Sequence, residues 1–460
     1  MTGTKNQDHP SMRILMVVEN ISLKMGGEAG AGFDYLRLLR ERNIEVRALC
    51  HGRVREELRQ EFAHDLEQFQ KIHFVDDTWY QALIWRIGKK FPYRIQDLIF
   101  NQIIHLITQY NARKLAKKLI AEHDIDLVFE PTPITPKGLS FMYDMSVPVV
   151  IGPLSGGLDF PAAFRYMDSK FSRLSVKISR FFSHLLHRLV PGKLKADVLI
   201  VANKQTQDAL PKGYQGKLYK VIEGGVDLDL WLPKKHYKSQ RDQIIRFIYV
   251  GRFVDWKGVE FLIEAFPSVI NSNNNNVVLE LVGDGPLQPH IKNRVEQLRI
   301  QNHVHFHGWQ PRAKVIQVLR ECDIFVMPSV RESCGMAIME AMAIGLPAIV
   351  ANWAGPSEIV DSRCGIKVDP TSPEQFRDGL AQAMIRLAQS PQLRDQMGEG
   401  AKQRVREDYF DWHSKCDRIV EIFSETLRQA TKVPALESEQ VQPKFDSFAG
   451  AERMSNLYKG

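Results

Sequence analysis

The sequence lacks the features that several common classes of protein require. Its five cysteines are scattered, without a CxxC pair, at Cys50, Cys322, Cys334, Cys364 and Cys416. This pattern excludes a disulfide framework and a zinc ribbon, and it favours a reducing compartment such as the cytosol. The polar first residues lead into ILMVV, which is shorter than the apolar core of about 7–15 residues in a secretory signal, so we expect no such signal.

Long apolar runs and metal-binding patterns are also missing. The most apolar stretch, Gly335–Pro356, contains Glu340 and Pro347, so we expect a buried helix and strand there rather than a membrane span. The 14 histidines show no HExxH-like spacing. Two acidic pairs have DxD spacing: Asp124 with Asp126, and Asp227 with Asp229. The first pair precedes a predicted strand and the second lies in a linker, so we predict structural roles and no bound metal.

What is present is the composition of an ordinary globular protein, with 44% hydrophobic and 25% charged residues. The 460 residues exceed the roughly 250–300 that one hydrophobic core supports, so we expect two domains. Lys and Arg outnumber Asp and Glu by 61 to 54, and this excess favours anionic partners. No signature of a nucleic-acid-binding module accompanies the excess, so we predict no nucleic-acid partner.

Short β-type runs alternate with longer helical patterns along the chain. Ten runs are predicted as strands: Arg13–Val18, Ile44–Cys50, Asp126–Phe129, Val147–Ile151, Asp197–Val201, Arg246–Val250, Val277–Val282, Val304–Phe306, Ile324–Met327 and Pro347–Val350. Buried strands separated by helices indicate parallel α/β sheets. The pattern restarts after Gly224–Pro233, so we expect two doubly wound, Rossmann-like domains facing each other across a cleft.

The most specific segment is PSVRESCGMAIMEAMAIGLPAIV, at 328–350. A predicted strand ends at its start, Glu332 follows, and Gly335 begins a helix that carries Glu340. Backbone N–H groups at a helix start bind anions, and carboxylates accept paired hydrogen bonds from sugar or ribose hydroxyls. Two solvated glutamates on a buried helix are the competing interpretation.

A second segment, VGRFVDWKGV at 250–259, places Arg252 and Lys257 in the loop after a strand. Two fixed cations stabilise the charge that accumulates on a diphosphate and a departing nucleotide. Together the two segments resemble the Arg/Lys loop and the E-x7-E motif of the retaining glycosyltransferases of family 4 (glycosyl transferases group 1), which have the two-Rossmann GT-B architecture. The resemblance covers residues 12 to about 425 and is strongest at 220–370.

The resemblance implies a donor site in the cleft. Arg252 and Lys257 would stabilise the leaving diphosphate, Glu332 would orient the donor sugar, and Glu340 would hold the ribose. The other expected donor-binding positions are Gly26, Gly27, Gly283, His307, Gly308, Cys334, Gly335, Met336 and Ala337. Of these, His307 is equally well explained as a packing residue, and Gly283 as part of a simple turn.

The acceptor side departs from the family pattern. Many members carry a His after the fourth or fifth strand, but the corresponding stretches, 128–136 and 150–159, contain none. Glu130, Ser155 and Asp159 are the polar alternatives there, and the sequence does not choose among them.

The resemblance also divides the chain. The expected parts are a flexible N-terminus (1–11), an acceptor-side domain (12–204), a nucleotide-sugar-binding domain (205–410), a helix that crosses back to the first domain (411–430) and a disordered tail (431–460).

Within the first domain, residues 160–195 contain eight Lys and Arg against one acid, interleaved with apolar residues. Such a stretch is typical of a helix on an anionic membrane surface, and equally of a helix docked on its own domain. Trp79–Lys90 is a second candidate of this kind.

We therefore expect a retaining hexosyltransferase that moves a sugar from a nucleotide-diphosphate donor, UDP first and GDP second, to an unidentified glycan or lipid-linked acceptor. The resemblance implies no cofactor or metal, and a cytoplasmic enzyme that is soluble or peripheral on the inner face of the membrane. The alternatives are a nucleotide-sugar epimerase or a phosphorylase of the same fold, and a non-catalytic basic protein that binds membrane or nucleic acid.

Overall fold

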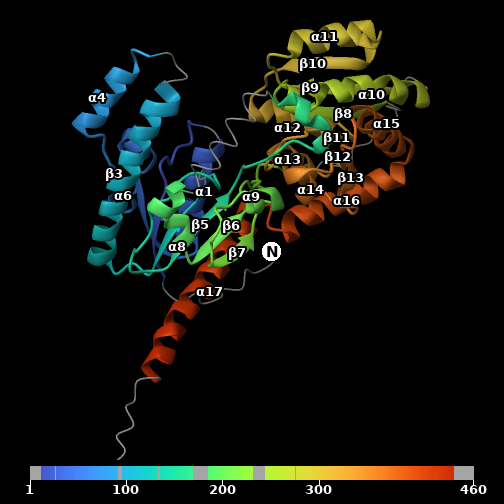
Figure 1. Cartoon of the computed structure of the whole chain (residues 1–460). Coiled ribbons are helices and arrows are strands. Elements are labelled where there is room, and N and C mark those ends of the chain that lie inside the picture. The colour runs from blue at the N-terminus through green and yellow to red at the C-terminus, as the bar shows by residue number, and fades with distance from the viewer. Residues whose placement is uncertain are drawn as a thin grey trace, which may run out of the picture.

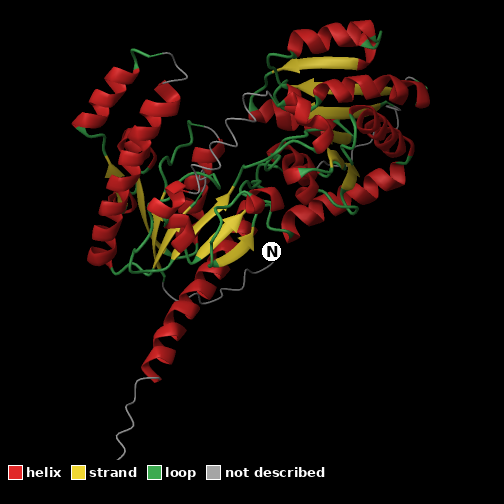
Figure 2. Ribbon diagram, in the orientation of Figure 1, coloured by secondary structure: helices red, strands yellow, loops and turns green. Residues whose placement is uncertain are grey.

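Two parallel sheets form the framework of the protein, one in each lobe, with helices on their faces (Figures 1 and 2). The computed structural model describes residues 12–25, 27–91, 96–131, 135–168, 185–231, 244–274 and 276–439. The first sheet has seven strands in the order β3-β2-β1-β4-β5-β6-β7, and the second has six in the order β10-β9-β8-β11-β12-β13. The predicted α/β class, with two doubly wound units, is confirmed.

The first sheet is built from the N-terminal half of the chain. Its strands are β1 (Arg13–Val17), β2 (Glu45–His51), β3 (Ile72–Val75), β4 (Leu127–Glu130), β5 (Val149–Leu154), β6 (Val198–Val201) and β7 (Lys217–Lys220). Its helical elements are α1 (Gly27–Glu41), η1 (Gly52–Val54), α2 (Arg55–Glu61), α3 (Leu66–Gln70), α4 (Trp79–Gly88), η2 (Gln96–Asn101), α6 (Gln102–His123), η3 (Ala162–Met167), α8 (Gly192–Lys195) and α9 (Lys204–Asp208).

The second sheet follows residue 243. Its strands are β8 (Ile245–Val250), β9 (Val277–Val282), β10 (Val304–Gly308), β11 (Ile324–Met327), β12 (Ala348–Ala351) and β13 (Gly365–Val368). The helical elements of this half are η4 (Asp255–Lys257), α10 (Val259–Ser272), α11 (Gln288–Gln297), η5 (Gln301–His303), α12 (Arg312–Glu321), α13 (Met336–Ile344), α14 (Ala354–Ile359), α15 (Pro373–Gln389), α16 (Pro391–Glu407) and α17 (Trp412–Glu439).

All ten strands predicted from apolar runs are present, within a few residues at each end. Strands β3, β7 and β13 are not among these ten runs. Strand β7 has the sequence KLYK and lies largely exposed at the edge of the sheet, so it carries no apolar run to reveal it. Strand β3, IHFV, has only four residues, and the middle two are half-buried.

The last helix returns the chain to the first domain. The Trp412 and Tyr35 rings meet edge to face with 5.4 Å between centroids, and Phe423 packs in the same manner on Phe129 of β4 at 5.0 Å. Helix α17 runs to Glu439 (Figure 1), past the boundary predicted at residue 430. Elongating an existing helix adds one hydrogen bond per residue, and therefore needs no apolar period of its own. Residues 440–460 lie outside the described ranges.

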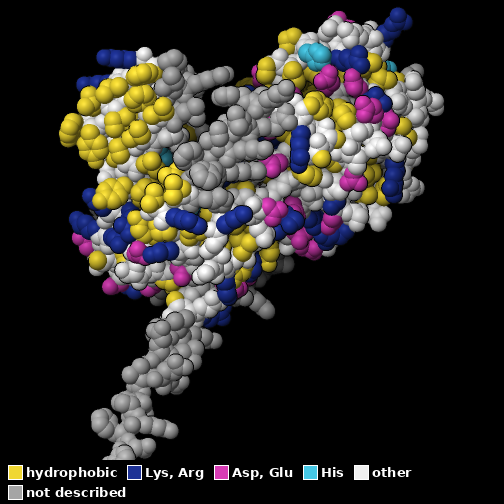
Figure 3. Space-filling view, viewed as in Figure 1, with side chains coloured by type: hydrophobic (Ala, Val, Ile, Leu, Met, Phe, Trp, Pro, Cys, Tyr) yellow, Lys and Arg dark blue, Asp and Glu magenta, His cyan; other side chains and the backbone are white. Residues whose placement is uncertain are grey.

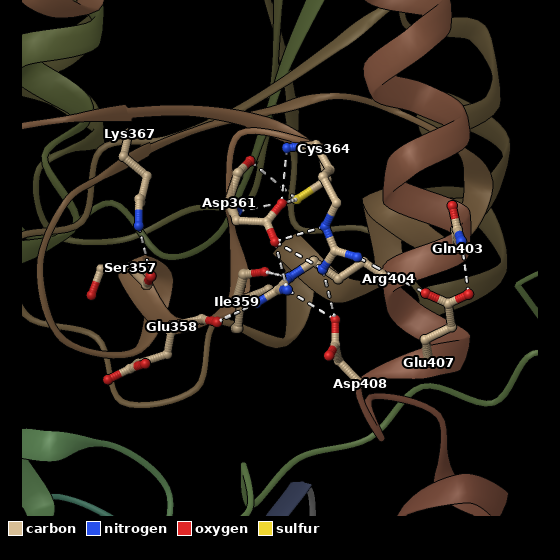
Figure 4. Close-up of polar contacts among 11 residues, drawn as sticks. Ser357, Glu358, Ile359, Asp361, Cys364, Lys367, Gln403, Arg404, Glu407 and Asp408 are labelled. Atoms are coloured by element: carbon tan, nitrogen blue, oxygen red, sulfur yellow. Dashed lines mark hydrogen bonds and ion pairs between the residues drawn. The ribbon is translucent and has the colours of Figure 1, made fainter.

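A polar network fixes the end of α16, just before this return. The Arg404 guanidinium donates to Asp361 Oδ2 and to Asp408 Oδ2, both at 2.8 Å, and to the carbonyl oxygen of Glu358 at 2.8 Å (Figure 4). Lys220 of β7 forms an ion pair with Glu358, which joins this network to the first sheet. The two domains are thus tied together where the chain crosses between them.

The basic stretch 160–195 is only partly described. At its start, Phe164 of η3 packs edge to face on Phe261 and Phe376 of the second domain, at 5.4 and 5.7 Å between centroids. Phe160 is buried in the same core. This end of the stretch therefore joins the two domains, whereas 169–184, which hold most of the predicted amphipathic helix, lie outside the described residues. No helix in the described part of the chain is long and apolar enough to cross a bilayer.

Candidate functional site

The strand orders identify where each sheet binds a ligand. In open parallel sheets, ligands lie beyond the carboxyl ends of the strands, at the point where the strand order reverses. This point falls between β8 and β11 in the second sheet, and between β1 and β4 in the first. Arg252 and Lys257 follow β8, and Glu332 follows β11, so the two motifs stand at the reversal point of their sheet.

The two motifs contact each other directly. Lys257 Nζ forms an ion pair with Glu332 Oε2, and both side chains are mostly buried. The Val330 amide donates to the carbonyl oxygen of Trp256 at 3.0 Å, which fixes one loop on the other. Gly258, the residue after Lys257, has a φ of +70°. A Cβ there would lie 2.2 Å from the carbonyl oxygen of Pro328, so only glycine allows the two loops to approach this closely.

The predicted helix start at Gly335 is present. Gly335 is the N-cap of α13 with a φ of +76°, three residues after Glu332, and the amides of the first turn follow it. Met336 and Ala337 in this turn are half-buried. Cys334 is buried, and a Cβ at Gly224 would lie 2.7 Å from its Sγ, so its side chain packs on the interdomain segment and only its backbone can reach a donor.

Glu340 lies inside α13, and burial raises the pKa of its carboxyl to about 7. Arg312 of α12 is its cationic neighbour, with 3.7 Å between Nη2 and Oε1. The Arg312 guanidinium also lies 5.4 Å from the centre of the buried Trp231 ring. The sequence did not reveal Arg312, because it lies outside both motifs, at the first position of α12.

The loops after β9 and β10 complete this edge of the second sheet. Gly283 has a φ of +127°, and a Cβ there would lie 2.0 Å from the carbonyl oxygen of Gly251, so the backbones approach closely, as they do at Gly258. The Gly283 amide donates to the carbonyl oxygen of Gly308 at 2.8 Å. His307 Nε2 lies 2.8 Å from Glu280 Oε2, a buried carboxylate of β9, so this imidazole is engaged within the domain.

The three acceptor-side candidates do not come together. Glu130 is 2% exposed, accepts a hydrogen bond from Ser140 Oγ at 2.5 Å and lies beside buried Lys193. Burial raises the pKa of Glu130 to about 7. The Glu130 side chain is thus enclosed within the first domain, whereas Ser155 is half-buried and Asp159 is exposed. Asp159 lines an interdomain cavity of about 630 Å³ with Trp353, whose Nε1 donates to the Asp159 carbonyl oxygen at 3.0 Å.

Ser155 is the candidate that reaches the E-x7-E segment. Its Oγ donates to Glu223 Oε1 at 2.6 Å and lies 2.6 Å from Ser333 Oγ, in the loop between Glu332 and Gly335. Asn203 of the first domain donates to the Ser333 carbonyl oxygen at 3.3 Å. The glycine-rich loop after β5 therefore touches the E-x7-E segment across the domain boundary.

A histidine that the sequence did not reveal stands at the reversal point of the first sheet. His105 of α6 has its Nδ1 2.9 Å from Oε2 of Glu19, which follows β1, and its side chain is 40% exposed. Arg53 Nη2 holds the other carboxylate oxygen at 3.3 Å. The hydrogen bond from His105 lowers the pKa of Glu19. Nothing in the local sequence IIHLITQY marks this residue, because only the packing of α6 over β1 brings it there.

Two further predictions concern glycines and metals. Gly26 lies outside the described residues, and Gly27 begins α1. Asp124 and Asp126, one of the DxD-like pairs, both pair with Arg13, at 3.3 and 3.2 Å. Within the described ranges, no cluster of three or more His, Cys, Asp and Glu could hold a metal ion.

Known proteins provide a comparison for this arrangement. The family model "Glycosyl transferases group 1" matches residues 233–404, which contain both motifs. The D-inositol 3-phosphate glycosyltransferase of Corynebacterium glutamicum is 26% identical over 250 residues, which cover 50% of this chain and 58% of that protein. The chain spans about half to two thirds of the length of the first curated relatives that it matches.

Solved structures match over most of the chain. A glycosyltransferase from Rickettsia africae superposes with a TM-score of 0.58 at 17% identity, covering 90% of this chain and 99% of that one. Anabaena HepE in complex with UDP superposes with a TM-score of 0.57 at 18% identity, covering 90% and 100%. At these identities the likeness concerns the fold. The sequence match and the shared fold agree: residues 233–404 match the glycosyl transferases group 1 family, family 4 of the glycosyltransferases, and the chain has the GT-B fold.

Proposed function

We propose that the protein is a retaining hexosyltransferase that transfers a sugar from a nucleotide-diphosphate donor to a hydroxyl acceptor. The observation that carries this proposal is the Lys257–Glu332 ion pair beside the start of α13, at the reversal point of the second sheet. This pair supports the proposal because a cation and a carboxylate are in contact, and the N-cap of α13, Gly335, follows Glu332 by only three residues.

In the proposed reaction, the bond between the anomeric carbon and the diphosphate oxygen breaks, and a bond to the acceptor oxygen forms on the same face of the sugar. The acceptor proton passes to the departing diphosphate. Arg252 and Lys257 stabilise the charge on the leaving group. Glu332 orients the sugar hydroxyls and Glu340 accepts hydrogen bonds from the ribose. None of these steps requires a metal.

Support for UDP as the first choice of nucleotide comes from a neighbour in fold, Anabaena HepE, whose solved complexes contain UDP and UDP-glucose. GDP is the second choice. The base would lie near the loops after β9 and β10, which contain Gly283 and Gly308. Since the His307 side chain is engaged by Glu280, only its backbone could take part.

On the acceptor side, we propose that His105 binds the hydroxyl that attacks. Glu19 holds its Nδ1, which fixes the ring of this partly exposed side chain and leaves Nε2 to bind the acceptor. The acceptor is a glycan or a lipid-linked glycan. Ser155 and Asp159 remain candidates for further acceptor contacts, and residues 160–195 for contact with anionic lipid.

The test is release of free nucleotide from UDP-, GDP- and ADP-sugars, with and without mixed glycan and glycolipid acceptors. A transferase releases one nucleotide per product glycoside, with the α or β configuration of the donor retained. Conversion of the donor to another nucleotide sugar, without release of nucleotide, would instead identify an epimerase-like enzyme. Release of a sugar phosphate that depends on added inorganic phosphate would identify a phosphorylase.

A further inference from the structure

An apolar surface is exposed on the outer side of the first domain. Large side chains on α4 (Trp79, Trp85 and Ile87) and on α6 (Ile103, Leu106 and Tyr110) are 37–78% exposed, with Trp79 the most exposed. Hydrophobic side chains gather over these two helices in the space-filling view, at its upper left (Figure 3). We call this the α4–α6 surface. Single exposed apolar residues are common, whereas a contiguous group marks a contact with something apolar.

Cations stand beside the aromatic rings of this surface. Lys89 Nζ lies 3.6 Å from the centre of the Trp85 ring, and Lys114 Nζ lies 4.5 Å from that of Tyr110. Between residues 79 and 118 the sequence has eight Lys and Arg and one acid, Asp97. The local charge is therefore strongly positive where the apolar side chains are exposed.

The order of side chains along α6 adds a direction. Ile103, Leu106, Tyr110, Lys114 and Lys117 follow each other at intervals of three or four residues, so they share one face of the helix. This face is apolar at its start, aromatic in the middle and cationic at its end. Side chains at a membrane interface have the same order, from acyl chains through the aromatic belt to anionic headgroups.

We propose that the α4–α6 surface docks on an anionic membrane. A protein partner would not require aromatic rings paired with cations along two neighbouring helices, whereas a lipid interface matches both at once. The contact differs from the one predicted at 160–195, whose start is buried between the domains. Docking does not depend on the proposed transferase activity. It does place the membrane on the helix that carries His105, close to where a lipid-linked acceptor would enter.

The experiment is co-sedimentation of the full chain with vesicles of phosphatidylcholine, alone or with 30% phosphatidylglycerol, roughly the charge of an anionic leaflet. We expect binding to the anionic vesicles that weakens with salt, because exposed charges are screened within about 8–10 Å. Lys89→Gln/Lys114→Gln should lower the partition coefficient by about 30-fold, which corresponds to about 1 kcal/mol for each cation. The matched control, Lys292→Gln/Lys314→Gln on the second domain, removes the same charge and should bind normally.

The apolar part is tested separately. Trp79→Ser/Ile103→Ser should abolish the binding that remains at high salt, while Leu66→Ser/Leu218→Ser, two exposed residues elsewhere on the first domain, should not. Unchanged thermal unfolding shows that each variant is folded. Equal binding to neutral vesicles, or no binding to either kind, would overturn the proposal. So would a dimer of the wild type that Trp79→Ser/Ile103→Ser dissociates, since a second copy would then cover the surface. Nucleotide release, measured in the same preparations, reports on the transferase independently.

Discussion

Ser155 and Ser333 meet across the domain boundary with 2.6 Å between their hydroxyl oxygens. A serine hydroxyl has one proton, and Ser155 donates it to Glu223, so Ser333 must be the donor to Ser155. The resulting chain, Ser333 to Ser155 to Glu223, links the donor motif to the first domain and to the segment between the domains. Its geometry exists only while the two domains are closed on each other.

The first prediction follows from this chain. Ser155→Ala removes both hydrogen bonds and leaves the carboxylate of Glu223 without its donor. A hydrogen bond to a charged group contributes about 1.5–3 kcal/mol, so we expect closure, and with it kcat/KM, to fall by roughly 10–100-fold. Small-angle scattering should show a more open average shape. Ser155→Thr keeps the hydroxyl and serves as the control. A Ser155→Ala enzyme with wild-type kcat/KM would exclude this contact from catalysis.

The second prediction concerns Lys257. Lys257→Ala should lower kcat by about 10²–10³, because a fixed cation that stabilises the leaving group is lost. Lys292→Ala removes an exposed lysine from the same domain and should leave kcat unchanged. Near-normal turnover of a folded Lys257→Ala variant would remove this residue from the mechanism. The measurement is single-turnover release of nucleotide at saturating donor.

The pairing of Lys257 with Glu332 could be anticipated from the sequence for a physical reason. Each follows a strongly apolar strand, and the carboxyl ends of parallel strands meet at one edge of the sheet. A glycine near each residue marked a tight approach of backbone. Strand, loop and glycine therefore carried enough local information to bring residues far apart in the chain together.

The side-chain contacts of Glu130 and His105 in the first domain could not be predicted in this way. Glu130 also ends an apolar strand, but Ser140 and Lys193 enclose it. Neither residue belongs to the apolar pattern that marks the strand. His105 reaches the site from the middle of a helix, through its contact with Glu19. Both outcomes depend on how helices and loops pack over the sheet, which periodicity does not encode.

The third prediction concerns metals. Activity should persist after dialysis against EDTA, because in the proposed mechanism Arg252, Lys257 and the start of α13 balance the charge of the departing diphosphate. Full loss of activity, restored by manganese or magnesium, would contradict this mechanism. Residual metal in the dialysed protein should be measured by mass spectrometry in the same sample.

The fourth prediction is a pH dependence of stability from Glu340. Burial raises the pKa of this carboxyl to about 7 in the folded state, above its ordinary value of 4.5. The folded protein therefore binds the proton more tightly than the unfolded chain, so this stabilisation is complete below pH 4.5 and is lost as the pH rises through 7. Glu340→Gln should flatten the decline of the melting temperature between pH 4.5 and 7. An unchanged slope of melting temperature against pH would show that a group other than Glu340 causes the decline. Glu321→Gln, an exposed residue, is the control.

The last prediction tests His105 as the acceptor-side group. His105→Ala should lower acceptor-dependent transfer by about 10–100-fold, the effect of losing a hydrogen bond of about 1.5–3 kcal/mol that positions the acceptor hydroxyl, and leave the affinity for the donor nucleotide unchanged. Glu19→Gln keeps the shape of the side chain but weakens its hold on the imidazole, so we expect a smaller loss, seen mainly as a higher KM for the acceptor.

The readouts separate this role from a structural one. Donor affinity measured by calorimetry reports on the second domain, and thermal unfolding reports on the packing of α6. His64→Ala, an exposed histidine of the same domain, is the matched control. If His105→Ala lowers donor affinity and transfer together, His105 acts through the fold, because a group that binds only the acceptor hydroxyl has no contact with the nucleotide. If both stay at the wild-type level, the acceptor is held elsewhere, and the cavity beside Asp159 and Trp353 becomes the next place to test.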